Sequence, residues 1–520
     1  THRFGFSPPR GPPPEVLCER TSLMETLSYL APLMQLDVMW TIALGTLGGL
    51  IIGALPGLTA TMGVALLIPL TFGMTPVMGL NMLIGIYIGG IYGGCVSSIL
   101  LRTPGTPASA ATVLDGYPMA QAGKAGQALG MATIASTIGG LIAAVVLASL
   151  APQLAGSALE FGAPEYFALA LFGLTIIASL SGDIVKGALS GLLGILIACV
   201  GADPISGVMR YTFGISGFAS GFAFTPARIG LFALSEVFTQ IERLAVKEPP
   251  VSLVNGRWPT RNDMKESRGA LIRGSLIGTL IGIIPGTGSG TASWISYNEA
   301  RRTSKTPEKF GTGHMPGIAA TESANNAVCA AALIPLLALG IPGDVVTAVL
   351  MGGLMIQGLA PGPMLFQTNP DVVVGIFGGT FMATIFMFIF GMALIPVFSK
   401  ILMVPRRLLT MSIVIFCFIG AFSINLNPVD LYTMVGFGVL GWGMNKFGYS
   451  QAALCIALIL GPMMEANLRR GLLQAGDDVI AFISGPITLL FLGLTVLSLC
   501  WPAIARRLAA KAPSQNEVTE

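Results

Sequence analysis

The chain has 520 residues, 53% of them hydrophobic and 10% charged, and its formal net charge is +3. About a quarter of a typical soluble domain is charged, so a soluble protein is excluded and a nucleic-acid partner is implausible. Continuous apolar runs of about 20 residues indicate an all-α polytopic membrane protein, and because they do not alternate they exclude a β-barrel. The seven cysteines stand singly and there are only two histidines, so we expect no cofactor, no metal site and no histidine-based catalysis.

The chain begins with a polar, Pro-rich segment, residues 1–23, which lacks the apolar core of a signal peptide. We interpret it as an N-terminal extension ahead of Met24. The remaining chain divides into a first membrane repeat (24–241), a cytoplasmic linker (242–268), a second membrane repeat (269–470), and a final span with a C-terminal tail (471–520).

One stretch occurs twice. LGTLGGLIIGALPGLTATMGVA, residues 44–65, breaks at Pro56-Gly57, and RGSLIGTLIGIIPGTGSGTASW, residues 273–294, breaks at Pro285-Gly286. A second break follows each copy, at Pro104-Gly105 and at Pro342-Gly343. Each half is therefore predicted to contain a re-entrant hairpin followed by a broken helix.

The predicted elements follow the same order in both halves, for a total of about 11–12 spans. In the first half they are the hairpin 38–55 and 58–73, the helix 80–101, and ordinary spans near 125–150, 165–182, 184–202 and 219–241. In the second half they are the hairpin 269–284 and 287–300, the broken helix 318–341 and 344–357, and spans near 371–398, 407–424, 428–444, 449–467 and 484–502. The four basic clusters can all be cytoplasmic if 269–300 enters and returns while 318–357 crosses as one broken helix, and the chain then crosses five times between the two hairpins. Because five is odd, the two repeats are predicted to be inverted, which points to a secondary transporter.

The four breaks are predicted to form a substrate site. A half-helix that begins after Pro-Gly presents free N–H groups and a positive dipole end, which suit a carboxylate. The alternative is that the glycines serve close helix packing. The candidate substrate-binding residues without a charge are Pro56, Gly57, Thr59, Thr61, Thr103, Gly105, Thr106, Pro285, Gly286, Thr287, Gly288, Ser289, Thr291 and Gly343.

Charged residues at membrane depth are costly and mark candidate functional positions. Arg102 and Asp344 flank equivalent breaks, and two roles stay open for Arg102: it clamps a substrate carboxylate, or it neutralises Asp344. Within TESANNAV, Ser323, Asn325 and Asn326 are candidate cation ligands together with Asp344, and the alternative is a polar stripe that ties helices together. The other acidic and basic residues of the membrane region, including Asp115, Asp203, Arg228 and Glu465, lie nearer predicted span ends and are interpreted as interfacial or structural.

Several strings resemble the large membrane subunit of the tripartite tricarboxylate transporters, the TctA family: LPGLTATMGVALLIPLTFG, IGIYIGGIYGGCVSSILL, TPGTPASAATVLDGYPMAQAGKAG and PGIAATESANNAV. The resemblance covers nearly everything from Met24 to the last span. It implies a multi-pass protein of the bacterial inner membrane that works with a small membrane subunit (TctB-like) and a periplasmic solute-binding protein (TctC-like). Where the family commonly has asparagine this chain has Arg102, and where it has an acidic residue this chain has Thr106. Arg102 is therefore a candidate specificity residue.

We expect secondary active, cation-coupled uptake of a carboxylate by alternating access, with an elevator-type movement by analogy to other hairpin-containing transporters. The substrate stays open among citrate, other di- and tricarboxylates and aromatic carboxylates, and the coupling cation between Na⁺ and H⁺. One alternative is a passive channel or an assembly scaffold for the small subunit. A membrane-embedded enzyme acting on lipid-linked acids is a remote alternative, because paired acid–base residues are lacking, and we expect no enzyme activity.

Overall fold

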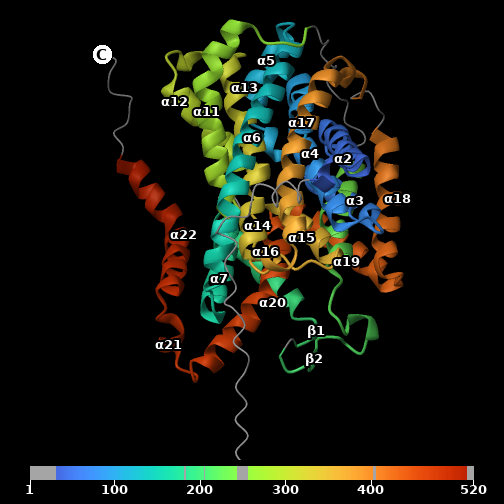
Figure 1. The fold of residues 1–520 in the computed structure, drawn as a ribbon, viewed down its shortest axis with the longest axis vertical. Coiled ribbons are helices and arrows are strands. Elements are labelled where there is room, and N and C mark those ends of the chain that lie inside the picture. The colour runs from blue at the N-terminus through green and yellow to red at the C-terminus, as the bar shows by residue number, and fades with distance from the viewer. Residues whose placement is uncertain (1–30, 181–182, 204, 243–255, 402–405, 512–520) are drawn as a thin grey trace, which may run out of the picture.

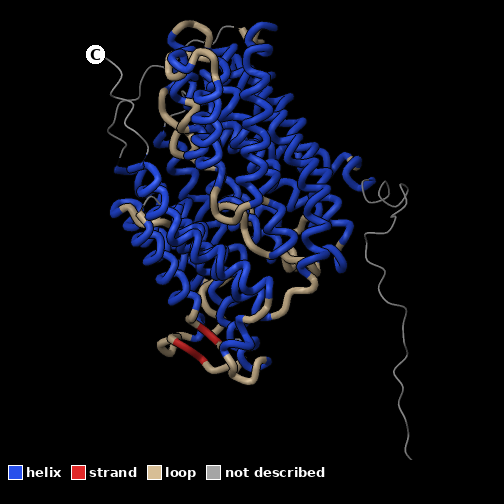
Figure 2. The backbone as a smooth tube through the Cα atoms, turned by 90° about the vertical axis from the view of Figure 1, so that its left-hand side faces the viewer, coloured by secondary structure: helices blue, strands red, loops and turns tan. Residues whose placement is uncertain are grey.

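The computed structural model describes residues 31–180, 183–203, 205–242, 256–401 and 406–511. In these residues the chain forms an elongated bundle of helices, with one small β-hairpin at one end (Figures 1 and 2). The predicted extension 1–23 and residues 243–255 of the predicted linker 242–268 lie outside the described residues.

The described residues of the first half form nine α-helices: α2 (Leu36–Ala54), α3 (Ala60–Leu67), α4 (Pro76–Leu101), α5 (Val113–Gln121), α6 (Ala125–Ala158), α7 (Ala163–Leu180), α8 (Ile184–Ala198), α9 (Phe224–Arg228) and α10 (Ser235–Glu242). Short turns of 3₁₀-helix are η1 (Ala31–Met34), η2 (Pro69–Thr71), η3 (Pro107–Ser109) and η4 (Ser216–Phe218), and a π-helix, η5 (Ile229–Leu234), joins α9 to α10. Strands β1 (Gly201–Ala202) and β2 (Met209–Arg210) pair antiparallel, with Gly201 opposite Arg210.

The second half contains α11 (Arg261–Ile283), α12 (Gly288–Thr303), η6 (Pro307–Lys309), α13 (Met315–Ala331), α14 (Leu333–Leu339), α15 (Val345–Ile356), α16 (Leu365–Thr368), α17 (Pro370–Ile401), α18 (Arg406–Asn425), α19 (Pro428–Phe447), α20 (Gln451–Gln474), α21 (Val479–Ile483) and α22 (Pro486–Lys511). All four predicted Pro-Gly breaks interrupt helices. One predicted span differs: 219–241 begins as a helix only at Phe224, because Gly221 turns the preceding chain with a φ of +78°.

Six helices in the described part of the chain are long and apolar enough to cross a membrane: α2, α4, α6, the continuous pair α13–α14, α17 and α20. Shorter apolar helices lie within α7, α8, α15, α18 and α22. Together they confirm the predicted all-α polytopic membrane protein.

Close glycine packing explains the repeated sequence stretch. On α2, Gly45, Gly49 and Gly53 lie against the backbone of α4, and a Cβ placed on Gly49 would lie 2.6 Å from the Cα of Ile86. On α11, Gly274, Gly278 and Gly282 face α13 in the same way. Small residues four apart allow two helices to approach to backbone contact. The glycines before each break therefore serve packing, as the alternative interpretation holds.

The contacts also show the direction of each helix. The glycines of α2 meet successively later residues of α4, so these two helices run parallel, and α11 runs parallel to α13 for the same reason. In contrast, α4 and α13 run antiparallel: Tyr87 lies close to Cys329, whereas Cys95, farther along α4, lies close to Glu322, which comes earlier on α13. Equivalent helices thus have opposite directions. This course agrees with the inverted repeat, which itself stays a prediction.

Packing between the halves follows matched pairs. Helix α17 of the second half packs against α4, and α6 of the first half packs against α13. Likewise η3, which follows the break in the first half, packs against α12, and α15, which follows the break in the second half, packs against α3. These elements form one unit around the four breaks, which we call the core.

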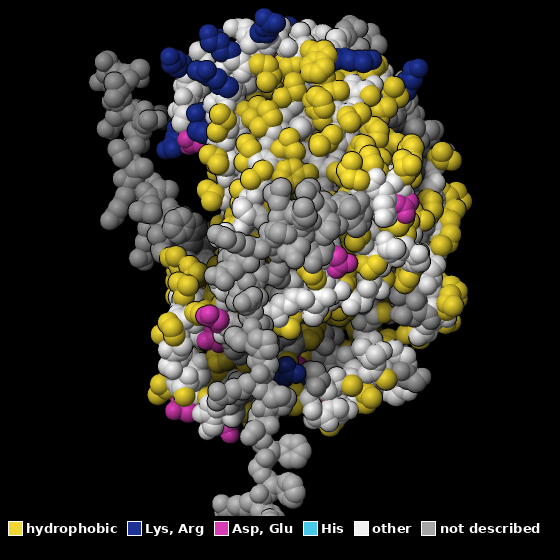
Figure 3. All heavy atoms as spheres, in the orientation of Figure 1, with side chains coloured by type: hydrophobic (Ala, Val, Ile, Leu, Met, Phe, Trp, Pro, Cys, Tyr) yellow, Lys and Arg dark blue, Asp and Glu magenta, His cyan; other side chains and the backbone are white. Residues whose placement is uncertain are grey.

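The core also includes α2 and α11, which pack on α4 and α13, whereas α7, α8, the segment from α9 to α10, α18, α19, α20 and α22 form a second unit, which we call the scaffold. Helix α20 packs against α7 and α8, and the segment from α9 to α10 packs against α18 and α19. Lys and Arg side chains gather at the end of the molecule where α5, α11 and α12 lie, opposite the β-hairpin (Figures 1 and 3). Arg301, Arg302 and Lys309 are exposed there. By the positive-inside rule this end faces the cytoplasm, and the β-hairpin lies at the other end.

Candidate functional site

The two breaks of the first half lie side by side. Gly57 follows the end of α2 with a φ of +85°, a conformation that glycine adopts without strain. Gly105 packs against the chain just before that break, because a Cβ placed on it would lie 2.5 Å from the carbonyl oxygen of Gly53. The Gly105 N–H donates to the carbonyl oxygen of Gly94 on α4, at 3.3 Å.

The two breaks of the second half are joined directly. The N–H of Gly286 donates to the carbonyl oxygen of Gly343 at 2.7 Å. Gly286 has a φ of +84° and Gly288 a φ of +71°. Gly288 also adjoins Asp344, since a Cβ on the glycine would lie 3.9 Å from the Cβ of Asp344. The third and fourth breaks therefore form one cluster.

This cluster also touches the second break. Ser293 on α12 donates through Oγ to the carbonyl oxygen of Ala108 at 2.7 Å, and Gly290 packs against Pro107. The first break faces the scaffold instead, because the carbonyl oxygen of Gly57 accepts a hydrogen bond from Nε2 of Gln240 on α10, at 2.9 Å. The second, third and fourth breaks thus form one cluster, while the first adjoins the second and also contacts the scaffold.

The half-helices that follow the breaks differ at their N-termini. Thr59 caps α3 by accepting the N–H of Met62 at 3.2 Å, and Asp344 caps α15. Helix α12 has no side-chain cap, because Thr287 donates to the carbonyl oxygen of Ile281 at 2.6 Å instead. Of the three helices α3, α12 and α15, α12 is therefore the one whose first-turn N–H groups stay free to bind an anion, which is the role predicted from the sequence. It carries the candidate residues Gly288, Ser289 and Thr291, and Pro285 and Gly286 precede it.

Asp344 is buried, with 4% of its surface exposed, and its carboxylate is fully engaged. Oδ1 accepts the N–H of Thr347 at 2.8 Å and its hydroxyl at 2.9 Å, in a capping box. Oδ2 accepts the hydroxyl of Tyr87 on α4 at 2.5 Å. Asp344 therefore fastens α15 to α4, which is a second role beside the predicted ligand role.

Arg102 does not contact Asp344 among the described residues. It ends α4 with a φ of +59°, is exposed, and places its guanidinium 5.8 Å from the ring centre of Tyr117. The neighbouring Thr103 is half-buried and Thr106 is buried, where Thr106 caps η3 together with Ser109. The proposed neutralisation of Asp344 by Arg102 is therefore wrong for this conformation, and the clamp role stays a prediction.

Glu322 lies at the centre of the molecule, with none of its surface exposed. Its Oε1 accepts a short hydrogen bond from the hydroxyl of Thr112, and its Oε2 accepts one from Ser136 on α6 at 3.3 Å. Both donors come from the first half of the chain. The sequence identifies the polar cluster around Glu322 but not these hydroxyl partners, whose positions depend on how α6 packs on α13.

The predicted cation ligands lie next to Glu322 on α13 and are all buried. The amide of Asn325 lies beside the Glu322 carboxyl but has no partner at full hydrogen-bond geometry in the described residues, and the Oδ1 of Asn326 is likewise unpaired. The Nδ2 of Asn326 donates to the carbonyl oxygen of Ile88 at 3.4 Å, and Ser323 donates to that of Ala320 at 3.3 Å. Unpaired buried amides are costly, so a polar stripe serving only to tie helices together accounts poorly for Asn325.

The two buried carboxyl groups share a further property. In the described part of the chain, neither Glu322 nor Asp344 forms an ion pair with a Lys, Arg or His side chain. A buried carboxylate without a counter-charge is strongly unfavourable, so such a group is protonated or binds a cation. Both carboxyls therefore suit coupling to H⁺ or to another small cation.

Asp115 shows that not every buried carboxylate belongs to this site. Its Oδ1 accepts the N–H groups of Gly311, Gly313 and His314 at 2.8–3.0 Å, and its Oδ2 accepts the hydroxyl of Tyr297. It thus fixes the loop before α13, which confirms the structural role predicted for it.

The interrupted helices and the buried polar groups at their centre define a polytopic α-helical membrane protein of the transporter type. The family described as "Tripartite tricarboxylate transporter TctA family" matches residues 39–456, and the chain belongs to this family. It is therefore the membrane component of a tripartite tricarboxylate transporter, which implies partner subunits.

Two similar proteins come from Agrobacterium vitis. One, described as an uncharacterized 52.8 kDa protein in the TAR-I ttuC' 3' region, is 39% identical over 472 residues, covering 90% of this chain and 94% of that protein. The other, in the TAR-II ttuC' 3' region, is 39% identical over 217 residues, covering 42% of this chain and 90% of that protein. No solved structure matches the chain.

Proposed function

We propose that the protein takes up a di- or tricarboxylate across the bacterial inner membrane by cation-coupled secondary active transport. The observation that carries this proposal is the pair of fully buried carboxyl groups, Glu322 and Asp344, without a basic partner in the described residues. A cation that binds there in step with the substrate supplies the driving force, because coupled binding equilibria affect each other reciprocally.

The carboxylate binds at the break cluster, beside the uncapped first turn of α12. The donors to the carboxylate are the main-chain N–H groups of Gly288 and Ser289 and the hydroxyl of Thr291. Arg102 binds the same carboxylate in the conformation in which the break cluster faces its guanidinium. The cation occupies the polar groups behind this cluster, Asp344 and the unpaired amide of Asn325 with its neighbours Ser323 and Asn326. Their placement near the middle of the bundle agrees with the midplane sites of transporters that have broken helices.

Alternating access follows from movement of the core against the scaffold. The strongest contacts between the two units run through α3, η2 and α15, which follow the breaks. An elevator-type displacement changes these contacts while the close glycine packing inside the core is kept. A TctC-like binding protein delivers the substrate from the periplasm, and a TctB-like small subunit completes the complex.

The test is uptake of labelled citrate, succinate and benzoate into proteoliposomes that contain the complex and its binding protein, under separate inward Na⁺ and H⁺ gradients. We expect one of these carboxylates to accumulate, and accumulation to stop when the gradient is dissipated. Equilibration without accumulation would indicate a passive channel, and a chemically altered product inside would indicate an enzyme.

Site variants test where the carboxylate binds. Asp344→Asn and Arg102→Ala are each expected to cripple uptake while the protein stays folded and assembled. Arg302→Met is the matched control, because Arg302 is exposed and pairs only with Glu299 on the same helix. Full activity in both site variants would contradict the assignment.

A further inference from the structure

Arg228 is a buried cation at membrane depth. Although the sequence places it near the end of a predicted span, only 2% of its surface is exposed. It ends α9, and the π-helix η5 begins at the next residue. Short π-helical segments often mark functional sites, because they displace side chains from the regular helical register.

The guanidinium of Arg228 has few partners. Its Nη1 donates to the carbonyl oxygen of Val349 on α15 at 3.2 Å, and the ring of Phe224 lies 5.5 Å from its central carbon. The thiol of Cys455 on α20 also lies beside the guanidinium, but Nε and Nη2 have no hydrogen-bond partner in the described residues, and no Asp or Glu contributes to its surroundings there. An arginine buried in this way needs an anion, because an uncompensated buried charge is strongly unfavourable.

Helix α15 is shaped to admit this guanidinium. A Cβ placed on Gly352 would overlap Nη1 and lie 3.1 Å from Cζ of Arg228, so only glycine leaves room there. The same helix begins at Asp344 in the break cluster. With a rise of about 1.5 Å per residue, the Arg228 contacts lie roughly 8–12 Å along the axis from that cap. The cation is thus one or two helical turns from the proposed substrate site.

A cavity of about 260 Å³ lies beside α9, the helix that Arg228 ends. Its wall includes Phe224 and Ala227 of α9, together with Leu458 of α20. Phe224 both lines the cavity and packs on the guanidinium of Arg228, so its ring lies between the two. The cavity also includes Ala202 of β1 and Arg210 of β2, so it lies toward the β-hairpin end of the molecule.

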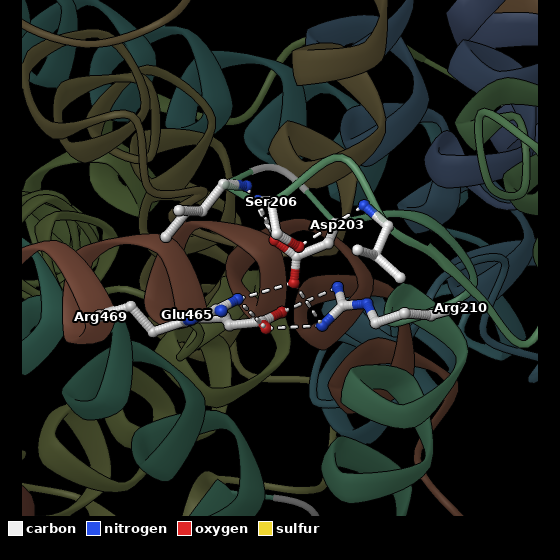
Figure 4. A network of polar contacts seen from close by, with 7 residues as sticks. Asp203, Ser206, Arg210, Glu465 and Arg469 are labelled. Atoms are coloured by element: carbon white, nitrogen blue, oxygen red, sulfur yellow. Dashed lines mark hydrogen bonds and ion pairs between the residues drawn. The ribbon is translucent and has the colours of Figure 1, made fainter.

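Arg210, which lines this cavity, is ion-paired through Nη1 and Nη2, although its Nε has no partner in the described residues. Arg210 forms two hydrogen bonds to Glu465 on α20, at 2.7 and 3.2 Å, and Asp203 joins Arg210 and Arg469 (Figure 4). The N–H groups of Ser206 and Ile205, together with Arg469, hold the pKa of Asp203 well below its ordinary value. Two acidic and two basic side chains balance one another here, in contrast to Arg228.

We infer that Arg228 is a carboxylate-binding residue of the transport pathway, which receives the substrate anion between the cavity and the break cluster. The inference rests on the proposed function. The two unpaired nitrogens, Nε and Nη2, lie on one edge of the guanidinium and match the two oxygens of a carboxylate. Movement of Phe224 admits the anion, and movement of α15 carries it toward Asp344.

The experiment compares Arg228→Met with wild type in thermal unfolding, with and without citrate, succinate and benzoate, and in proteoliposome uptake. Removal of an unpaired buried charge leaves the melting temperature of the substrate-free protein unchanged or raises it. The carboxylate-induced rise in melting temperature disappears, and the apparent KM rises roughly tenfold or more, as expected for loss of a charged hydrogen bond. Arg228→Lys keeps the charge without the paired nitrogens and gives an intermediate effect.

Two controls separate binding from structure. Succinamide, a neutral match for succinate, leaves the wild-type melting temperature unchanged. Arg210→Met lowers the melting temperature of the substrate-free protein, because it leaves Glu465 and Asp203 short of counter-charge. If Arg228→Met keeps the wild-type KM and carboxylate-induced shift, the arginine is structural and the inference fails. If wild type itself accumulates no carboxylate, the proposed function fails instead.

Discussion

The close packing of α2 on α4 predicts that alanine substitutions at two neighbouring glycines change the stability of the protein in opposite directions. A Cβ on Gly49 would lie 2.6 Å from the Cα and 2.8 Å from the carbonyl carbon of Ile86, whereas ordinary contact begins at 3.4 Å. Gly49→Ala therefore forces the two helices apart by nearly an ångström, which costs about 1–3 kcal/mol as overpacking. Gly48, one residue earlier, has nothing within 4 Å of such a Cβ. Gly48→Ala instead stabilises the helix by about 0.5–1 kcal/mol.

The assay is thermal unfolding of the purified full-length variants in one detergent, with tryptophan fluorescence as the signal. The two estimates together predict a separation of about 1.5–4 kcal/mol between Gly48→Ala and Gly49→Ala, with wild type between them. If Gly49→Ala is as stable as Gly48→Ala, the packing account of the repeated stretch is refuted. The same contrast in uptake would show whether the core must stay closely packed to function.

Three further changes test the buried polar groups and the β-hairpin. Tyr87→Phe leaves Oδ2 of Asp344 without its donor and is expected to lower the free energy of unfolding by about 1–3 kcal/mol. Tyr92→Phe should cost less, because it removes a hydrogen bond between two hydroxyls. Equal losses of stability in thermal unfolding would contradict this prediction. Asp203→Asn removes a carboxylate whose pKa is lower in the folded protein than in the unfolded chain, where it is about 3.9. The ionised Asp203 stabilises the fold above the pKa of the unfolded chain, and this stabilisation is lost as pH falls below that pKa. The difference in melting temperature between Asp203→Asn and wild type should therefore shrink from pH 6 toward pH 3. A difference that stays constant over this range would refute the prediction. Glu322→Gln keeps the shape of the side chain and removes its charge, so its melting temperature should equal or exceed that of wild type; a marked decrease would show that the charge stabilises the fold.

Much of the architecture follows from local sequence. Pro56-Gly57 and Pro285-Gly286 each follow a long apolar run, where proline cannot continue a helix, so these two breaks are predicted directly. The length and continuity of the apolar runs predict the membrane-spanning helices. The repeated glycines predict that the two halves are alike. The structure adds that glycines four residues apart contact backbone atoms four residues apart on the neighbouring helix.

The site is less predictable, because its partners come from distant segments. Nothing near Glu322 in the sequence indicates that Thr112 and Ser136 donate to it. Arg228 lies close to a predicted span end, where exposure is the ordinary expectation, yet α15 and α20 of the other half cover it. Arg102 shows the reverse case, since its place beside a break predicts a buried role and it is exposed in this conformation.

The central claim is that cation and carboxylate enter together, and simultaneous measurement of both fluxes tests it most directly. Labelled substrate is added to proteoliposomes that hold no initial ion gradient, and entry of Na⁺ or of H⁺ is recorded with substrate entry. The account predicts that wild type carries one of these cations in a fixed ratio to the carboxylate, and that Glu322→Gln loses this accompanying flux. Substrate entry without any cation, or an unchanged ratio in Glu322→Gln, would contradict it.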